Sequence, residues 1–172
     1  MAIQTILTEP NKALRQISKP VIQVGKSEQK LMDDMLETMY AANGIGLAAI
    51  QIGIPKRIIV MDLSKDENKK EPRYFVNPVI KNKNEINSTY EEGCLSVPDQ
   101  FAEIDRPKEC EVEYLDYNGK KSFLKAEGLL ATCIQHEMDH LEGILFIDYL
   151  SKLKKSMIIK KLSKNKLRRI VV

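Results

Sequence analysis

The chain has 172 residues, 43% of them hydrophobic and 30% charged, which is ordinary for one soluble globular domain without disulfides. Residues 1–10 include Glu9 and no sustained apolar run, so we expect no secretory signal. Three cysteines, an odd number, are typical of reduced thiols in a cytoplasmic protein. The longest weakly polar stretch, residues 41–55, is too short to span a bilayer. We therefore expect a cytoplasmic location and no membrane partner.

The net charge of +3 is unevenly distributed along the chain. Residues 151–172 contain nine Lys or Arg and no Asp or Glu, whereas the rest carries 18 basic and 24 acidic side chains. The basic character therefore belongs to a C-terminal tail and not to the preceding domain.

The first predicted element is a helix that begins after Ser27, a candidate N-cap, and ends at Asn43-Gly44. Its apolar stripe, which we assign to the core, consists of Leu31, Met32, Met35, Leu36, Met39 and Tyr40. Residues 57–62 and 74–80 are predicted strands, and the polar residues 64–72 are a predicted surface loop between them.

Residues 111–117 and 121–126 alternate on either side of Asn118-Gly119 and predict a hairpin. A second helix is predicted from Gly128 through His140, ending near Gly143, and a third from about Asp148 into the basic tail. The apolar side chains expected to pack the third helix on the domain are Leu150, Leu153, Met157, Ile158 and Leu162. Strands and helices are segregated, which favours an α+β fold over a doubly wound sheet. We expect one compact α+β domain, residues 1–172, with a basic C-terminal helix at 151–172.

The two histidines of the chain, His136 and His140, are four residues apart, so one helical turn places both imidazoles on the same face. This is the spacing of two ligands of one divalent metal, and Glu137 between them is placed to move protons for a metal-bound water. A helix with two surface histidines is the alternative interpretation.

The chain has no third histidine, so a third metal ligand has to be another side chain. The remaining candidates with a soft donor atom are the three cysteines. Cys94 lies in a predicted tight loop, residues 91–98, from which a thiolate can reach a helix. Cys110 lies beside a strand and suits a small buried side chain. Cys133, one turn before His136, suits a pocket wall, but as a fourth ligand it would make a closed, structural site.

Three separated segments resemble the signature motifs of the peptide deformylase family. They are GIGLAAIQ at residues 44–51, EGCLS at residues 92–96 and QHEMDH at residues 135–140. Their order, their spacing and the length of the chain also fit, and the similarity extends from Ile3 to the C-terminal helix. The resemblance implies an α+β fold with antiparallel sheets around a central metal-binding helix.

The resemblance implies a metal site made of Cys94, His136 and His140, with water in the fourth position. Ligand types alone suggest zinc. The family typically uses Fe²⁺ and accepts Ni²⁺, Co²⁺ or Zn²⁺, so we expect one divalent ion per chain, Fe²⁺ in the cell.

The implied reaction is hydrolysis of the formyl group from nascent N-formyl-methionyl polypeptides, with release of formate. Glu137 would act as general base and then general acid. Gln51 and the backbone N–H of Leu95 would stabilise the oxyanion, as their counterparts do in the family. Gln51 capping a Gly-rich turn is the alternative interpretation.

The resemblance also implies a pocket for the methionine side chain. It would be lined by Ile45, the aliphatic part of Glu92, Leu129, Cys133 and His136, and the backbone around Ile45 and Gly46 would pair with the peptide. Plain helix core is the alternative for Leu129 and Cys133.

Three further side chains lie near these motifs. Asp139 and Glu142 flank the ligands and could orient the imidazoles, although Asp139 could instead pair with Arg106 and Glu142 with solvent-exposed cations. Phe101 stands where many relatives carry an arginine near the pocket mouth, which affects contacts beyond the first peptide residue.

Two other functions remain open, a zinc endopeptidase and an inactive relative that binds ribosome or RNA. The former normally takes a downstream Glu or His as third ligand, and the latter would lack a base or a ligand. For the basic tail, a solvated lysine-rich face is the default and contact with ribosomal RNA is the sharper hypothesis. We expect no DNA partner.

Overall fold

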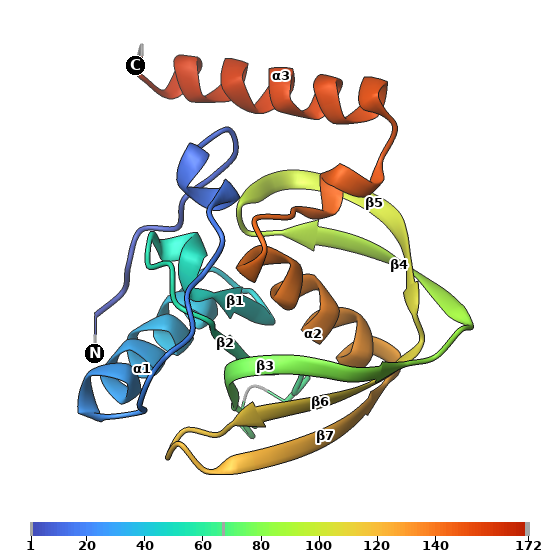
Figure 1. Ribbon diagram of the computed structural model, residues 1–172. Helices are drawn as coiled ribbons and strands as arrows, with labels where there is room; N and C mark the ends of the chain where they lie inside the picture. Colours follow the sequence, from blue (N-terminus) through green and yellow to red (C-terminus); the bar gives the residue numbers. More distant parts are fainter. Residues whose placement is uncertain (1, 67, 171–172) are drawn as a thin grey trace.

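The molecule consists of two antiparallel sheets that hold one helix between them (Figure 1). The computed structural model describes residues 2–66 and 68–170, and the side chains of 166–170 are outside the description. The α-helices are α1 Lys26–Ala41, α2 Gly128–Leu141 and α3 Lys152–Ile170. The strands are β1 Gly46–Ala48, β2 Ile58–Met61, β3 Arg73–Lys83, β4 Asn87–Cys94, β5 Val97–Pro107, β6 Glu109–Leu115 and β7 Lys121–Glu127. Short 3₁₀ helices are η1 Lys12–Arg15, η2 Ala49–Ile52 and η3 Phe146–Tyr149.

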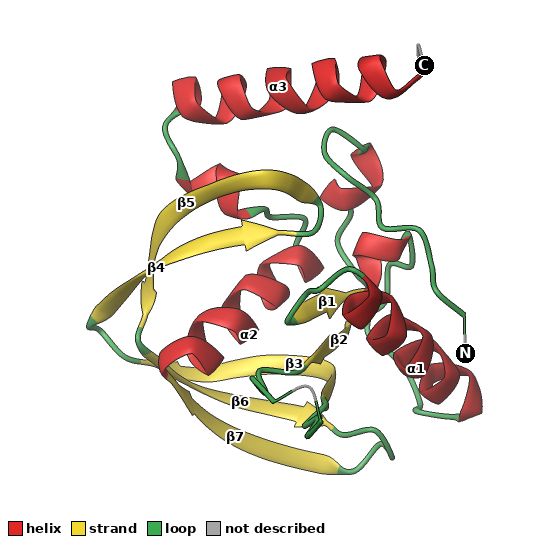
Figure 2. Cartoon of the chain, turned by 180° about the vertical axis from the view of Figure 1, so that it is seen from behind, coloured by secondary structure: helices red, strands yellow, loops and turns green. Residues whose placement is uncertain are grey.

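The larger sheet has the strand order β1-β2-β3-β6-β7, and every pairing in it is antiparallel. The smaller sheet is the hairpin β4-β5. Both views place α2 between the larger sheet and this hairpin, with α1 beside β1 and β2 (Figures 1 and 2). The prediction of one compact α+β domain with antiparallel sheets and a C-terminal helix is confirmed.

Helix α2 is central because its sequence is apolar enough to be buried on several sides. Ile134 and Leu141 belong to the core cluster that includes Ile59 and Phe75 of the larger sheet. The face toward the hairpin instead carries buried polar side chains, including His136. Buried polar groups are costly unless they find partners, so this face marks the region of the chemistry.

The helix boundaries correct two details of the sequence prediction. The N-cap of α1 is Gly25 and not Ser27, and the Gly25 N–H donates to the Glu28 carboxylate at 3.1 Å. The third helix begins at Lys152, because the residues from Phe146 to Tyr149 form the separate helix η3. The end of α2 near Gly143 agrees with the prediction, and Gly143 has a φ of 72° that favours glycine.

The segment around Cys94, expected to be a tight loop, is the tip of the β4–β5 hairpin. Its strands, 87–94 and 97–107, were missed because they are rich in charged and polar residues. Their pairing with each other and their contact with α2 outweigh this weak local preference. The other hairpin is where the sequence predicts it, with strands shifted by one or two residues and joined by residues 116–120.

The C-terminal helix packs on the domain through fewer residues than expected. Leu162 is buried, and Leu150 and Ile158 pack against the same cluster. Leu153 and Met157 are 71% and 62% exposed, so the prediction that they face the core is wrong. Residues 171 and 172 of the predicted tail lie outside the described part. Among the described helices, none is long and apolar enough to cross a membrane.

Candidate metal centre

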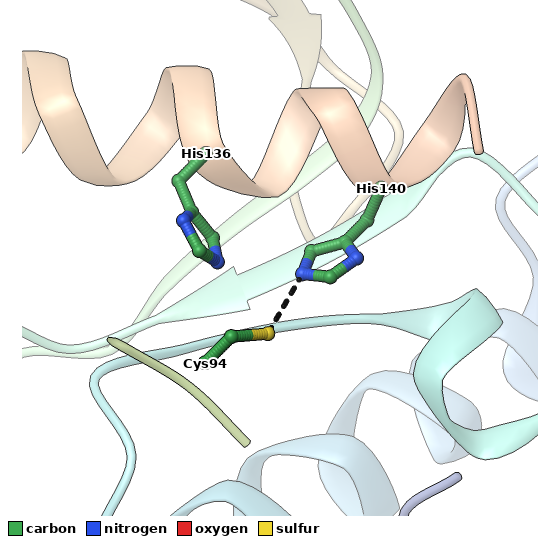
Figure 3. A group of neighbouring side chains, drawn as sticks. All are labelled: Cys94, His136 and His140. Atoms are coloured by element: carbon green, nitrogen blue, oxygen red, sulfur yellow. Dashed lines mark hydrogen bonds between the residues drawn. The ribbon is translucent and has the colours of Figure 1, made fainter. Parts of the chain in front are cut away.

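The two histidines of α2 and the cysteine at the end of β4 converge on one point (Figure 3). One ligand atom from each of Cys94, His136 and His140 lies within 4.8 Å of the other two. Cys94 Sγ is 3.3 Å from His140 Nε2, and the imidazole centroids are 5.1 Å apart. Both histidines are buried, so the interpretation as surface histidines is wrong.

The other two cysteines do not join this group. Cys110 is a buried core residue of β6, and burial raises the pKa of its thiol to about 11. Cys133 is buried on α2, where burial raises its thiol pKa well above the usual value. Among the described residues, the donor atoms that come together are those of Cys94, His136 and His140, so the group has three protein side chains, the number found in catalytic sites.

The hairpin aims Cys94 at α2 through an irregular tip. The regular register ends at Gly93, which pairs with Phe101, and shifts so that Cys94 pairs with Val97. Such a shift bends the strand and changes the direction of its side chains. Gly93 has no side chain here because a β-carbon would lie 2.6 Å from the Phe101 ring.

A buried ion-pair network holds His136 from behind. Its Nδ1 donates to Glu92 Oε2 at 2.8 Å, which leaves Nε2 for the site. Arg106 donates to both oxygens of Glu92, at 2.6 and 3.1 Å, and to Asp139 at 2.8 Å. The Tyr149 hydroxyl also donates to Asp139, at 2.7 Å.

This network corrects the assignment of the orienting carboxylates. Asp139 pairs with Arg106, as one alternative had it, and Glu142 forms an ion pair with Arg57. The carboxylate that contacts a ligand is Glu92, which the sequence analysis placed in the pocket wall only. The sequence around Glu92 gave no sign of these contacts. Glu92 and Arg106 stand on opposite strands, and the register of the hairpin, which pairs Ser88 with Arg106, brings them together.

Gln51 reaches the centre from η2, at the end of the first motif. The Ala48 N–H donates to Gln51 Oε1 at 2.9 Å, which directs the amide nitrogen away from η2. That nitrogen donates to Ser96 Oγ at 3.0 Å and lies 3.6 Å from Cys94 Sγ. Gln51 therefore caps the turn through its amide oxygen and approaches the metal site through its amide nitrogen. Ser96 had no predicted role.

Glu137 is buried against β1, and burial raises the pKa of its carboxyl to about 7. Its Oε2 has no hydrogen-bond partner among the described residues. A carboxyl with a pKa near neutrality and a free oxygen is suited to taking up and releasing a proton.

The surroundings of the two imidazoles fit a bound cation. Burial lowers the pKa of His140, which keeps that ring neutral as a metal ligand must be. Burial acts in the same direction on His136, but the Cys94 thiol and the Glu92 carboxylate outweigh it and raise the pKa of His136. The thiol and imidazole donors of this group suit a divalent transition metal.

A pocket of about 560 Å³ opens beside this centre. Its wall includes every residue predicted for substrate binding: Ile45, Gly46, Glu92, Leu129 and Cys133. Gln51, Cys94, Leu95, His136 and Glu137 also line it. Leu129 and Ile45 are 41% and 47% exposed at the mouth, so Leu129 is not plain helix core, whereas Cys133 is buried.

Known proteins share this sequence and fold. Residues 3–156 match the family model described as polypeptide deformylase. The peptide deformylase of Pelagibacter ubique is 83% identical over all of both chains, and that of Maricaulis maris is 57% identical over 95% of this chain and 94% of its own. A crystal structure of peptide deformylase from Ehrlichia chaffeensis has a TM-score of 0.91 and 42% identity, covering 96% and 97% of the two chains. A second one from that organism, in complex with actinonin, has a TM-score of 0.90 and 45% identity over 96% and 98%.

Fold and site thus define a metal-dependent amide hydrolase. The chain belongs to the polypeptide deformylase family. It removes the N-formyl group from the N-terminal formyl-methionine of newly synthesised polypeptides and releases formate. The family match and the full-length identity favour this function over the endopeptidase and inactive-relative alternatives.

Proposed function

We propose that Cys94, His136 and His140 hold one Fe²⁺ ion as the deformylase metal, with the fourth position open toward the pocket. The convergence of the three donor atoms within 4.8 Å supports this assignment. Thiolate and imidazole together accept several divalent metals, so Zn²⁺, Ni²⁺ or Co²⁺ can substitute. When bound, the ion supplies Lewis acidity, activating a water molecule and polarising the formyl oxygen.

Glu137 is the general base and acid of the reaction. Its carboxylate accepts the proton of the attacking water and delivers it to the departing amine. The free Oε2 beside the pocket and the raised pKa of this carboxyl support both halves of that role. A carboxyl that titrates near pH 7 can be both a base before attack and an acid after it.

Gln51 and the backbone N–H of Leu95 donate to the oxygen on which negative charge develops. The Ala48 N–H holds the amide oxygen of Gln51, which directs the amide nitrogen, the donor, toward the site. Leu95 stands in the turn next to Cys94, where its backbone is held by the hairpin.

The methionine side chain of the substrate enters the 560 Å³ pocket between α2 and the hairpin. Leu129 and Cys133 supply its apolar wall from α2, and Ile45 covers it from the other side. The Ile45–Gly46 backbone leads into β1 and can pair with an extended peptide.

The basic α3 adds a second proposal, contact with ribosomal RNA. Lys160 and Lys164 are exposed on α3, and residues 151–172 contain no acidic side chain. A polyanion such as RNA binds a basic surface of this kind with release of counterions. The substrate is made on ribosomes, and the cytoplasm is therefore the proposed location.

The roles at the centre are tested by Glu137→Ala. This variant should retain metal at the wild-type stoichiometry and lose formate release from a formyl-Met peptide. The observation that carries the proposal is the position of Glu137 beside the three ligands. Persistent turnover in the metal-loaded variant would refute the base assignment, and loss of metal from Cys94→Ala is the matched check on the ligand set.

A further inference from the structure

A second groove begins where the active-site pocket ends. It has a volume of about 580 Å³ and lies between β5 and the first half of α3. Gln100 and Phe101 line both cavities, so the two spaces adjoin at this part of β5. Figures 1 and 2 both show β5 lying between β4 and α3.

The groove is apolar at its base and charged at its rim. Leu150 and Ile158 line it and also pack against the core cluster that holds α3 in place, which makes this wall firm. Met157 lines it and is 62% exposed. Lys154 and Lys161 stand on the α3 side and Glu103 on the β5 side.

The β5 side of the groove also offers main-chain groups. In the described part of the chain β5 pairs with β4 alone, so its edge toward α3 has no strand partner. A free strand edge binds extended peptides through backbone hydrogen bonds, with pockets for alternate side chains. Phe101 is 66% exposed at the junction, and its ring lies on Gly93, next to the metal ligand Cys94.

We propose that this groove binds the downstream part of the polypeptide substrate, as an extended segment that carries apolar side chains. The proposal rests on the deformylase function of the pocket. A polypeptide substrate is longer than the pocket and has to leave it, and the groove adjoins the pocket at Phe101. The two lysines favour acidic side chains in the same segment.

The experiment measures kcat/KM for two peptide substrates in the absence of ribosomes. One is a formyl-Met tripeptide, and the other is a formyl-Met peptide of about twelve residues with leucines downstream, about 40 Å long when extended. The long peptide should be the better substrate of the wild-type enzyme. Met157→Glu should lower its kcat/KM about tenfold, equivalent to about 1.4 kcal/mol, and leave the tripeptide unchanged.

Leu153→Glu is the matched control, since Leu153 is 71% exposed on the same helix and does not line the groove. It should affect neither peptide. Met157→Ser is a second variant that adds no charge and should give a smaller loss of the same kind.

Equal kcat/KM for the two peptides in the wild-type enzyme would overturn the groove proposal, as would an equal loss in Met157→Glu and Leu153→Glu. A loss on the tripeptide as well would place the effect in the catalytic pocket and also overturn it. A change in ribosome co-sedimentation alone would assign the groove to the ribosome instead. Failure of the wild-type enzyme to deformylate the tripeptide would count against the function itself, which separates the two failures.

Discussion

The Glu137 carboxylate lies directly against the backbone of Gly46, in the space that a side chain at Gly46 would occupy. A β-carbon there would overlap Glu137 Oε1 and stand 2.9 Å from its Cδ. Glu137 of α2 can therefore lie this close to β1 only because residue 46 is a glycine. This glycine belongs to the first motif.

Gly46→Ala should displace the Glu137 carboxylate and lower kcat by about 100-fold, since a displacement of about 1 Å at a reacting group has effects of that size. Metal content should stay at the wild-type level because the three atoms nearest to the added methyl group all belong to Glu137 and not to a ligand. The control is Gly25→Ala, where the added methyl group meets its neighbour at an ordinary 3.5 Å. Wild-type kcat in Gly46→Ala would show that the carboxylate position is not critical.

Glu92→Gln should weaken metal binding by about 10- to 100-fold, measured by competition with a chelator. The substitution removes the charge that both His136 and Arg106 contact, and it leaves a buried guanidinium with fewer charged partners. Glu142→Gln, on the exposed ion pair with Arg57, is the matched control and should bind metal normally. Equal affinity in both variants would mean that Glu92 does not orient the ligand.

Protein purified without oxygen should contain one iron per chain, measured by elemental analysis. Removal of the ion with a chelator should abolish formate release, and Fe²⁺ added under anaerobic conditions should restore it. Exposure to air should then reduce activity in parallel with iron content, whereas a Ni²⁺-loaded sample should keep its activity. Zinc as the ion of the anaerobic preparation would contradict the assignment of Fe²⁺.

Glu28 should make the stability of the fold sensitive to acid. Hydrogen bonds from Lys56, Ser27 and the Gly25 backbone lower the pKa of its carboxyl from 4.5 to about 2. Because the pKa is lower in the folded state, the stabilisation is complete above pH 4.5 and is lost as the pH falls toward about 2. Glu28→Gln should thus reduce the free energy of unfolding near neutrality and differ less from the wild type in acid. Urea titrations at several pH values measure this.

The comparison for Glu28 is Glu37→Gln, on the same helix, for which the described residues provide no ion-pair partner. At neutral pH, Glu37→Gln should change the free energy of unfolding less than Glu28→Gln does. A Glu28→Gln effect that is constant with pH would indicate that the charge of Glu28 is not involved.

Reversing the charge of Lys160 and Lys164 to Glu should weaken co-sedimentation with ribosomes and reduce its dependence on salt. Both side chains are exposed on α3, and neither lines the groove beside β5. Deformylation of a free tripeptide should be unchanged. If co-sedimentation is also unchanged, the lysines form only a solvated face.

The sequence by itself determined what depends on local spacing. A spacing of four positions from His136 to His140 places both rings on one face of a helix whatever surrounds it, and Glu137 stands between them in the sequence. The apolar stripe of α1 and the hairpin around Asn118-Gly119 are local in the same sense, and they were predicted with small errors at their ends.

The tertiary structure decided the contacts between distant segments. Cys94 reaches His140 because the irregular tip of a hairpin lies against α2. Glu92, on the same hairpin, contacts His136, and Arg106 of the opposite strand donates to the Glu92 carboxylate. The polar strands of that hairpin carry little intrinsic preference, so pairing and burial define them, and neither can be read from neighbouring residues. The exposure of Met157 was missed for the same reason, since helical spacing gives the face of a helix but not what packs on it.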